Sequence, residues 1–144
     1  MKTKKYPHPT VDAIIEKDNK IVLIKRKKEP FIGKWALPGG HVKARETVED
    51  AVVRETKEET SLDIKPKEIL GVYSDPRRDI RNTISTVFIV EFIGGKIIGG
   101  SDATEAKWFD LDKIDFDDLA FDHAKILKDY LKWKTKKQTF WSSK

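Results

Sequence analysis

Three glutamates fall on one face of a predicted helix near the middle of the chain. At about 100° per residue, an apolar stripe begins at Val48, Glu55 and Glu59 continue it, and Glu58 lies beside it. Like-charged pairs at these spacings each destabilise a helix by roughly 0.2–0.5 kcal/mol. A divalent cation would remove the repulsion, and Mg²⁺ takes oxygen ligands while leaving positions for water and phosphates. The cluster therefore favours a phosphate-handling metal site, with a solvated acidic helix end as the alternative interpretation.

The segment that carries these glutamates resembles the Nudix box, G-x5-E-x7-R-E-U-x-E-E-x-G-U, where U is aliphatic. The positions that match at the required spacing are Gly40, Glu46, Arg54, Glu55, Glu58, Glu59 and Leu62. The preceding Trp-Ala-Leu-Pro-Gly-Gly at 35–40 resembles the lead-in of that family. Two positions depart: Thr56 replaces an aliphatic residue, and Ser61 replaces the glycine that ends the helix. Glycine is favoured there because φ is commonly positive, so Ser61 either bears strain or the helix ends differently.

The resemblance implies a metal-dependent hydrolase of nucleoside diphosphate derivatives. It assigns Mg²⁺, with Mn²⁺ as the alternative, to Gly39, Glu55, Glu58 and Glu59. Metal ions at such a site polarise phosphoryl oxygens, help to generate hydroxide and neutralise the charge of the leaving group.

The same resemblance assigns catalytic roles to Arg54, Glu55 and Glu58, and places Glu46 near the metals or beside Arg54. The general base is either a glutamate of the box or a glutamate in a later loop. Glu105 is the loop candidate, with a surface turn residue as its alternative interpretation.

A second segment indicates the substrate. Residues 71–81, Gly-Val-Tyr-Ser-Asp-Pro-Arg-Arg-Asp-Ile-Arg, resemble the Ser-Asp-Pro-x-Arg-Asp-x-Arg segment of the ADP-ribose pyrophosphatase subfamily, although Thr83 stands where histidine often follows. Arginines are planar donors suited to phosphates and ribose hydroxyls, and aspartates accept from hydroxyls. The predicted substrate-binding residues are Arg77, Arg78, Asp79 and Arg81. A charged hairpin loop without a ligand is the alternative.

Two further residues are weaker candidates for substrate binding. Arg26 ends a predicted strand and could reach a phosphate, and Trp35 or Phe31 could stack on adenine, although an aromatic here is more often part of the core. The leading substrate is ADP-ribose, cut to AMP and ribose 5-phosphate. Oxidised nucleoside triphosphates and dinucleoside polyphosphates are the alternatives within the family.

The elements that position these residues are strands, a helix, more strands and a second helix. Strands are expected at 11–15, 20–27, 68–74, 83–93 and 106–110, the first two forming a hairpin across the Asp18-Asn19 turn. Helices are expected from Thr47, which approximates a capping box with Asp50, to Thr60, and over 122–134. An ordered loop is expected between Pro30 and His41. This order predicts an α/β (α+β) fold, one Nudix domain over 1–144 with a mixed sheet between helices.

Composition limits the other classes of function. Of 144 residues, 37% are charged, with 29 Lys+Arg against 24 Asp+Glu, and none is cysteine, which excludes disulfides and thiolate metal sites. No apolar run approaches the roughly 20 residues needed to cross a membrane, so a cytoplasmic protein is expected. The resemblance implies a homodimer. The basic ends leave open a non-catalytic nucleotide- or nucleic-acid-binding module, but nucleic acid is not the expected partner.

Overall fold

The computed structural model describes residues 5–98 and 105–144. The strands are β1 (His8–Ile14), β2 (Glu16–Lys17), β3 (Lys20–Lys25), β4 (Trp35–Ala36), β5 (Gly39–His41), β6 (Asp63–Tyr73), β7 (Thr83–Gly94), β8 (Glu105–Asp110) and β9 (Phe140–Trp141). The α-helices are α1 (Val48–Thr60) and α2 (His123–Thr135), and two 3₁₀ turns, Leu111–Lys113 and Phe116–Asp118, precede α2. Within the described ranges, neither helix is long and apolar enough to cross a membrane.

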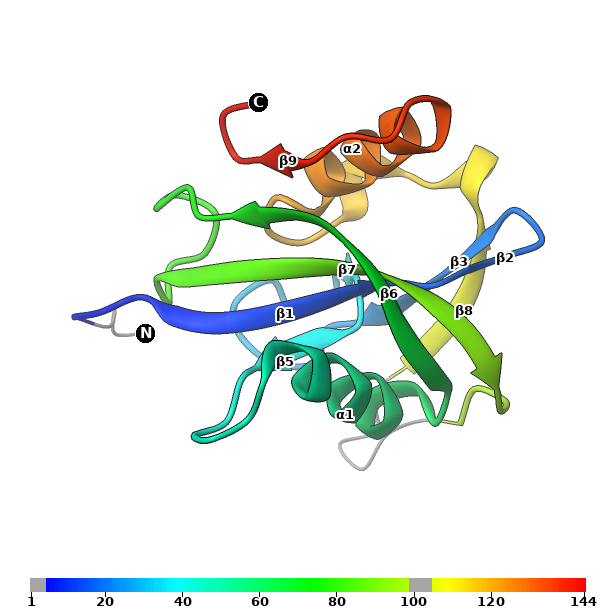
Figure 1. Cartoon of the computed structure of the whole chain (residues 1–144), viewed down its shortest axis with the longest axis horizontal. Coiled ribbons are helices and arrows are strands. Elements are labelled where there is room, and N and C mark those ends of the chain that lie inside the picture. Colours follow the sequence, from blue (N-terminus) through cyan, green and yellow to red (C-terminus); the bar gives the residue numbers. More distant parts are fainter. Residues whose placement is uncertain (1–4, 99–104) are drawn as a thin grey trace.

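The strands form two sheets (Figure 1). The larger sheet has the order β5-β1-β7-β6-β9 and is mixed, because β1 runs parallel to β7 while β5 runs antiparallel to β1. In the smaller sheet, β3 pairs with β2, β4 and β8, in each case antiparallel. β1 therefore lies inside the larger sheet, where its residues are held from both sides.

The two helices cover opposite faces of the larger sheet (Figure 1). Alternate residues of a strand point to opposite faces, and the two apolar clusters follow that alternation. Val11 and Ala13 pack with Val52 of α1, whereas Ile14 packs with Ile126 of α2. The predicted arrangement of a mixed sheet between helices is confirmed.

Helix α1 begins and ends as its sequence predicts. The Thr47 hydroxyl accepts a hydrogen bond of 3.1 Å from the Asp50 N–H, so the cap satisfies an amide that has no partner within the helix. At the other end Ser61 has φ 67°, the left-handed conformation that usually takes glycine. Ser61 therefore carries the strain itself, at a cost of roughly 1–2 kcal/mol. Its N–H donates to the Lys57 carbonyl at 2.9 Å, which closes the helix.

The predicted hairpin across Asp18-Asn19 is confirmed at its turn, but its first arm is Glu16–Lys17 rather than the predicted strand 11–15. β1 pairs with β5 and β7, and only the two-residue strand Glu16–Lys17 turns back to pair with β3. The chain leaves one sheet and enters the other at Ile15, which is fully buried between them. The turn at Asp18-Asn19 is real, since both residues have positive φ. The predicted loop over 30–41 also contains β4 and β5, and β6 begins five residues earlier than the 68–74 prediction.

One buried hydroxyl in α1 has no hydrogen-bond partner among the described residues. Thr56 Oγ1 is enclosed in the apolar face of the helix, at the position where the family carries an aliphatic residue. One turn later, the hydroxyl of the equally buried Thr60 donates to the Thr56 carbonyl at 2.6 Å and accepts from the Leu62 N–H at 3.1 Å. The two buried threonines therefore differ in one respect: the Thr60 hydroxyl is hydrogen-bonded and the Thr56 hydroxyl is not, among the described residues.

We predict that Thr56→Val stabilises the protein, because valine keeps the shape and removes a desolvated hydroxyl. The expected gain is about 1 kcal/mol, a rise in melting temperature of roughly 2–4 °C for a domain of this size. Thr60→Val is the control and should lower the melting temperature, since it removes two hydrogen bonds. Scanning calorimetry of both variants decides the matter, and equal changes for the two would contradict the assignment.

Candidate active site

Arg54 joins the carboxylates of α1 to the loop before the helix. Its Nε and Nη2 donate to the two oxygens of Glu46 at 2.7 and 2.9 Å, and its Nη1 donates to Glu55 at 2.9 Å and Glu58 at 3.2 Å. Nη2 also donates to the His41 carbonyl of β5 at 3.1 Å. These hydrogen bonds lower the pKa of Glu46 to about 2 and raise the pKa of Arg54. The guanidinium therefore holds three glutamates of the box close together.

Glu59 is directed away from Arg54, toward the lead-in glycines. Its Oε1 accepts a hydrogen bond of 2.8 Å from the Gly39 N–H. Burial raises the pKa of Glu59 well above its usual range, although the Gly39 hydrogen bond opposes the shift. A Cβ at Gly39 would collide with the Val11 carbonyl oxygen, and a Cβ at Gly40 would collide with the Glu55 carboxylate. Glycine is therefore required at Gly39 by the close approach of the β1 backbone, and at Gly40 by the close approach of the Glu55 side chain.

The carboxylates of the box glutamates are the type of ligand that a hard cation prefers, but they are not grouped at one point. Within residues 5–98 and 105–144, no three Asp, Glu, His or Cys side chains are grouped so as to hold a metal ion. Arg54 Nη1 contacts both Glu55 and Glu58, and the Glu58 side chain is 53% exposed. Burial raises the pKa of Glu55, against the opposing effect of Arg54. The donors are all carboxylate oxygens beside Gly40, which has no side chain, so their chemistry fits a divalent cation.

A pocket of about 240 Å³ opens beside Glu59. Its walls include Gly39 and Gly40 together with Arg26, Arg81 and Phe121. Arg26 donates from Nε to the Pro30 carbonyl at 2.6 Å and from Nη2 to the Lys28 carbonyl at 3.3 Å. The guanidinium carbons of Arg26 and Arg81 lie 4.9 and 5.4 Å from the centroid of the Phe121 ring. Two cations are therefore held around one aromatic ring next to the carboxylates.

The pocket is also lined by a buried pair, Asp12 of β1 and His123 of α2. Asp12 Oδ1 is 3.7 Å from His123 Nε2, and the Ser85 hydroxyl donates to Asp12 Oδ2. His123 Nδ1 accepts a hydrogen bond of 3.0 Å from the Leu37 N–H, which makes Nε2 the protonated nitrogen of a neutral ring. Burial raises the pKa of Asp12 to about 7 and lowers the pKa of His123 to about 3. The pair fixes the segment that leads into Gly39.

The arginine-rich segment divides its side chains between solvent and interior. Arg77 is exposed and paired with Asp75 at 2.7 Å. The Arg78 side chain, 3% exposed, binds both oxygens of Asp122 and donates to Thr83 Oγ1 at 2.6 Å. Thr83 thus occupies a place in this network where the subfamily often has histidine.

Asp79 and Arg81 complete the network at the pocket. Arg81 binds the buried Asp79 carboxylate, with Nη2 at 2.8 Å, and Thr83 donates to the same carboxylate at 3.0 Å. Burial raises the pKa of Asp79, but the hydrogen bonds from Arg81 outweigh it and the pKa is lowered. Both residues line the pocket, as does Arg78.

Six of the predicted site residues lie outside the pocket walls, namely Arg54, Glu55 and Glu58 of α1 together with Trp35, Arg77 and Glu105. Trp35 packs edge-to-face on Phe109, with ring centroids 4.7 Å apart, against the apolar core under α2. Glu105 begins β8, and its carboxylate lies 3.6 Å from Lys27. Arg77 reaches a neighbouring cavity instead. The structure therefore brings together Arg26, Gly39, Glu59, Arg78, Asp79 and Arg81, with Arg54, Glu55 and Glu58 behind Gly40 and His41.

Sequence reasoning missed Asp12, His123 and Phe121 as parts of the site. Asp12 is a carboxylate in the apolar run 11–15. A charged residue in such a run is unusual, and it could have indicated a functional residue. Phe121 and His123 adjoin the predicted start of the last helix, but only the fold shows that this start meets β1. Their pocket contacts could not be obtained from spacing.

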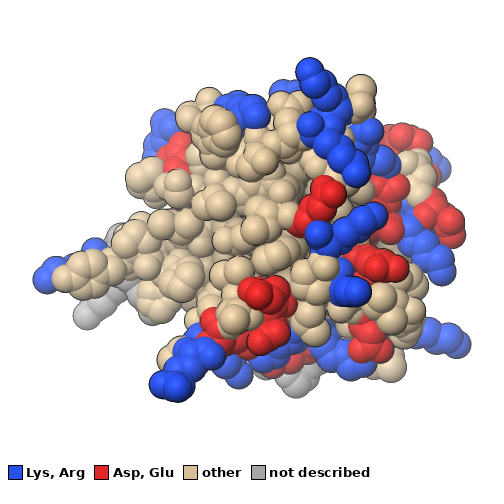
Figure 2. All heavy atoms as spheres, in the orientation of Figure 1, with Lys and Arg blue, Asp and Glu red and all other residues tan. Residues whose placement is uncertain are grey.

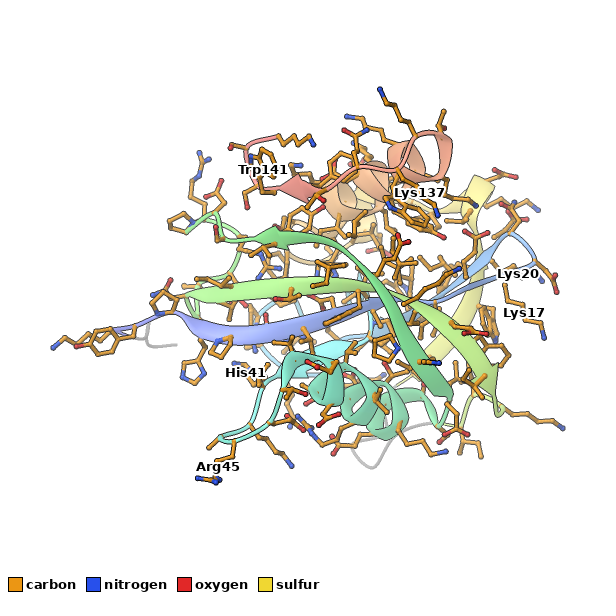
Figure 3. All side chains as sticks on the ribbon, in the orientation of Figure 1. Lys17, Lys20, His41, Arg45, Lys137 and Trp141 are labelled. Atoms are coloured by element: carbon orange, nitrogen blue, oxygen red, sulfur yellow. The ribbon has the colours of Figure 1, made fainter. Side chains whose placement is uncertain are left out.

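The centre of one face of the molecule has few charged side chains (Figure 2). Over β1 and β7 the surface is mostly uncharged, whereas Lys, Arg, Asp and Glu gather over α1 and toward the β2–β3 end. Lys17 and Lys20 extend from that end, His41 extends from the end of β5, and Arg45 extends from the β5–α1 connection (Figure 3).

Comparison with known proteins gives the class to which this fold and site belong. A model of the NUDIX domain matches residues 6–130. The ADP-ribose pyrophosphatase of Methanocaldococcus jannaschii is 60% identical over 136 residues, which are 92% of this chain and 79% of the relative. The chain belongs to the NUDIX domain family.

Solved structures agree with that assignment. A NUDIX hydrolase from Nitrosomonas europaea superposes with a TM-score of 0.84 at 28% identity, covering 96% of this chain and 79% of the other. The NUDIX domain of Shewanella oneidensis NrtR, solved in complex with ADP ribose, superposes with a TM-score of 0.75 at 25% identity, covering 90% and 89%.

We predict that His123 makes the protein less stable as the pH falls below about 6.5. A histidine with a lowered pKa in the folded state binds its proton only on unfolding, so stability is lost between the unfolded pKa of 6.5 and the folded pKa of about 3. Between pH 6.5 and pH 5 this amounts to about 2 kcal/mol. Asp12 acts in the opposite direction, because its raised pKa favours the folded state at low pH.

The measurement is urea unfolding of wild type, His123→Asn and the control His8→Asn at pH 7.5 and 5.0. The free energy of unfolding of the His123 variant should fall less between these pH values than that of wild type, while the control should follow wild type. Parallel losses in all three proteins would contradict the prediction.

Proposed function

We propose that this protein hydrolyses the diphosphate bond of ADP-ribose to AMP and ribose 5-phosphate, using a divalent metal ion. The observation that carries the proposal is the Arg54 network, which holds Glu46, Glu55 and Glu58 together beside the pocket that is lined by Glu59 and three arginines. The 60% identity to a relative named ADP-ribose pyrophosphatase supports the substrate, as does the bound ADP ribose of the NrtR domain.

The metal ion would be held by the carboxylates of Glu55, Glu58 and Glu59, with the Gly39 backbone beside them. Mg²⁺ fits this all-oxygen donor set, and Mn²⁺ takes the same ligands. Such an ion lowers the pKa of a bound water and stabilises charge on phosphoryl oxygens.

The side chains of the pocket bind and orient the substrate. Arg26 and Arg81 provide guanidinium donors for the diphosphate oxygens, and Asp79 fixes Arg81 in place. A water oxygen attacks one phosphorus, a new P–O bond forms, and the bridging P–O bond breaks to release the other phosphate. The proton of the water passes to a glutamate of the box, because Glu105 is not among the residues that line the pocket and its carboxylate lies 3.6 Å from Lys27.

The substrate assignment predicts a clear order of rates. With Mg²⁺ present, purified protein should turn over ADP-ribose with a higher kcat/KM than 8-oxo-dGTP or diadenosine polyphosphates. Arg26 and Arg81 line the pocket and suit a diphosphate, which ADP-ribose carries between its adenosine and its terminal ribose. Turnover of ADP-ribose no faster than that of the triphosphate would assign a different substrate. Binding without any hydrolysis would indicate a non-catalytic nucleotide-binding module.

Glu58 is the box glutamate whose replacement should be most informative. We predict that Glu58→Gln lowers kcat by at least about 10²-fold, equivalent to about 2.7 kcal/mol of transition-state stabilisation. Glu49→Gln, an exposed change of the same chemistry in the first turn of α1, is the control and should keep kcat within about two-fold. Steady-state kinetics at saturating Mg²⁺ provides the comparison. Near-normal turnover by the Glu58 variant would remove Glu58 from the mechanism.

We also propose that the protein is a homodimer, on the basis of its resemblance to the family. The mass in solution should be twice that of the 16.6 kDa chain when measured by multi-angle light scattering. A mass equal to that of one chain would end this proposal.

A further inference from the structure

A second cavity adjoins the pocket that contains Glu59. It measures about 260 Å³, and Phe121 and Arg78 line both spaces, so Phe121 stands between them. The other walls are Phe31, Asp75, Arg77, Asp122, Lys125 and Ser142. Sites for ligands of moderate size usually measure about 300–1,000 Å³. Neither space reaches that range alone, whereas the two together do.

The cations of the second cavity are already neutralised by carboxylates. Arg77 lies 2.7 Å from Asp75 and Lys125 lies 2.6 Å from Asp129. Arg78 is likewise paired with Asp122, at 2.9 Å. This cavity therefore has little positive charge to offer a phosphate.

The first pocket differs, because Arg26 forms no ion pair with a carboxylate of the described residues, although Asp79 and Glu59 act on it electrostatically. In the part of the chain that the structure describes, the Arg26 donors bind only the backbone carbonyls of Lys28 and Pro30. The diphosphate of a substrate therefore belongs beside Arg26, and an uncharged part of the substrate belongs in the second cavity.

The second cavity has an aromatic wall made by two phenylalanines. Phe31 and Phe121 meet edge-to-face with ring centroids 5.0 Å apart, and Phe31 is 40% exposed. Both have positive φ, 64° and 52°, a conformation that is uncommon for bulky residues and is concentrated at ligand sites. Flat rings at a surface bind other flat rings by stacking.

We propose that the second cavity is the subsite for the nucleobase, with Phe31 as its stacking residue and Phe121 as the partition between base and diphosphate. The assignment rests on the proposed function for the identity of the substrate. It divides ADP-ribose so that the adenine ring contacts Phe31, while the phosphates remain beside Arg26 and Glu59. The ribose 5-phosphate half then stays outside the second cavity.

The two products of the reaction test this assignment directly. Isothermal titration calorimetry without added metal measures the Kd of AMP and, separately, of ribose 5-phosphate. Phe31→Ala should weaken AMP binding at least about ten-fold and leave ribose 5-phosphate within about two-fold. Phe31→Tyr, which keeps the ring, should retain AMP binding. Ile32→Ala is the matched control, since Ile32 is 57% exposed in the same loop and lines neither space.

The other outcomes of this titration would each contradict the proposal. Loss of ribose 5-phosphate binding alone would overturn the proposal by assigning the cavity to the other half of the substrate. Equal weakening of both ligands, or of neither, would overturn it as well. Because AMP binding is measured without turnover, failure to hydrolyse ADP-ribose would contradict the proposed function and leave the test of the nucleobase subsite readable.

Discussion

The structure depends on keeping several carboxylates close together on one face of α1. Like charges at this spacing oppose helix formation and each other, and the helix dipole disfavours them near the C-terminal end. Arg54 offsets this repulsion because its planar fork presents donors in several directions. It binds Glu46 with two donors, Glu55 and Glu58 with a third, and the His41 carbonyl with a donor already shared with Glu46. A lysine at this position could not make the same set of contacts.

The Arg54 network also explains why the site is built where a helix meets an inner strand. Glu59 leaves the network and binds Gly39, and Gly39 fits only because it has no Cβ to collide with β1. The side chain of Asp12 lies on the face of β1 that α2 covers, and it contacts His123 of α2. The carboxylates of α1 are thus connected through β5 and β1 to the start of α2. Both helices that cover the larger sheet consequently contribute to the walls of one pocket.

The features that the sequence could predict are local ones. The cap at Thr47 and the apolar face of α1 follow from neighbours within a few residues, and the structure has both; for Ser61 the sequence left strain or a different helix end open, and the structure shows the left-handed conformation. The first arm of the hairpin was wrong because strand pairing is decided over a distance: β1 and β3 have similar apolar patterns, but β1 pairs with β7, some 75 residues away. Trp35 was ambiguous for the same reason, since only the fold places it against Phe109. Phe121 lines the pocket because the start of α2 lies against β1, and residue spacing in the sequence cannot predict that contact.

The arginine-rich segment shows how buried ion pairs can set the specificity of a neighbouring pocket. Arg78 is enclosed and engaged with Asp122 and Thr83, so its contacts fix the start of α2 and with it the backbone of Phe121. Arg81 is held by Asp79 with its guanidinium near the Phe121 ring. The ion pairs of these two arginines therefore hold the Phe121 partition in place, whereas Arg26 forms no ion pair with a carboxylate of the described residues. A substrate that carries its negative charge in the middle and a flat ring at one end matches this distribution, because the phosphates meet the cation and the ring meets the aromatic wall.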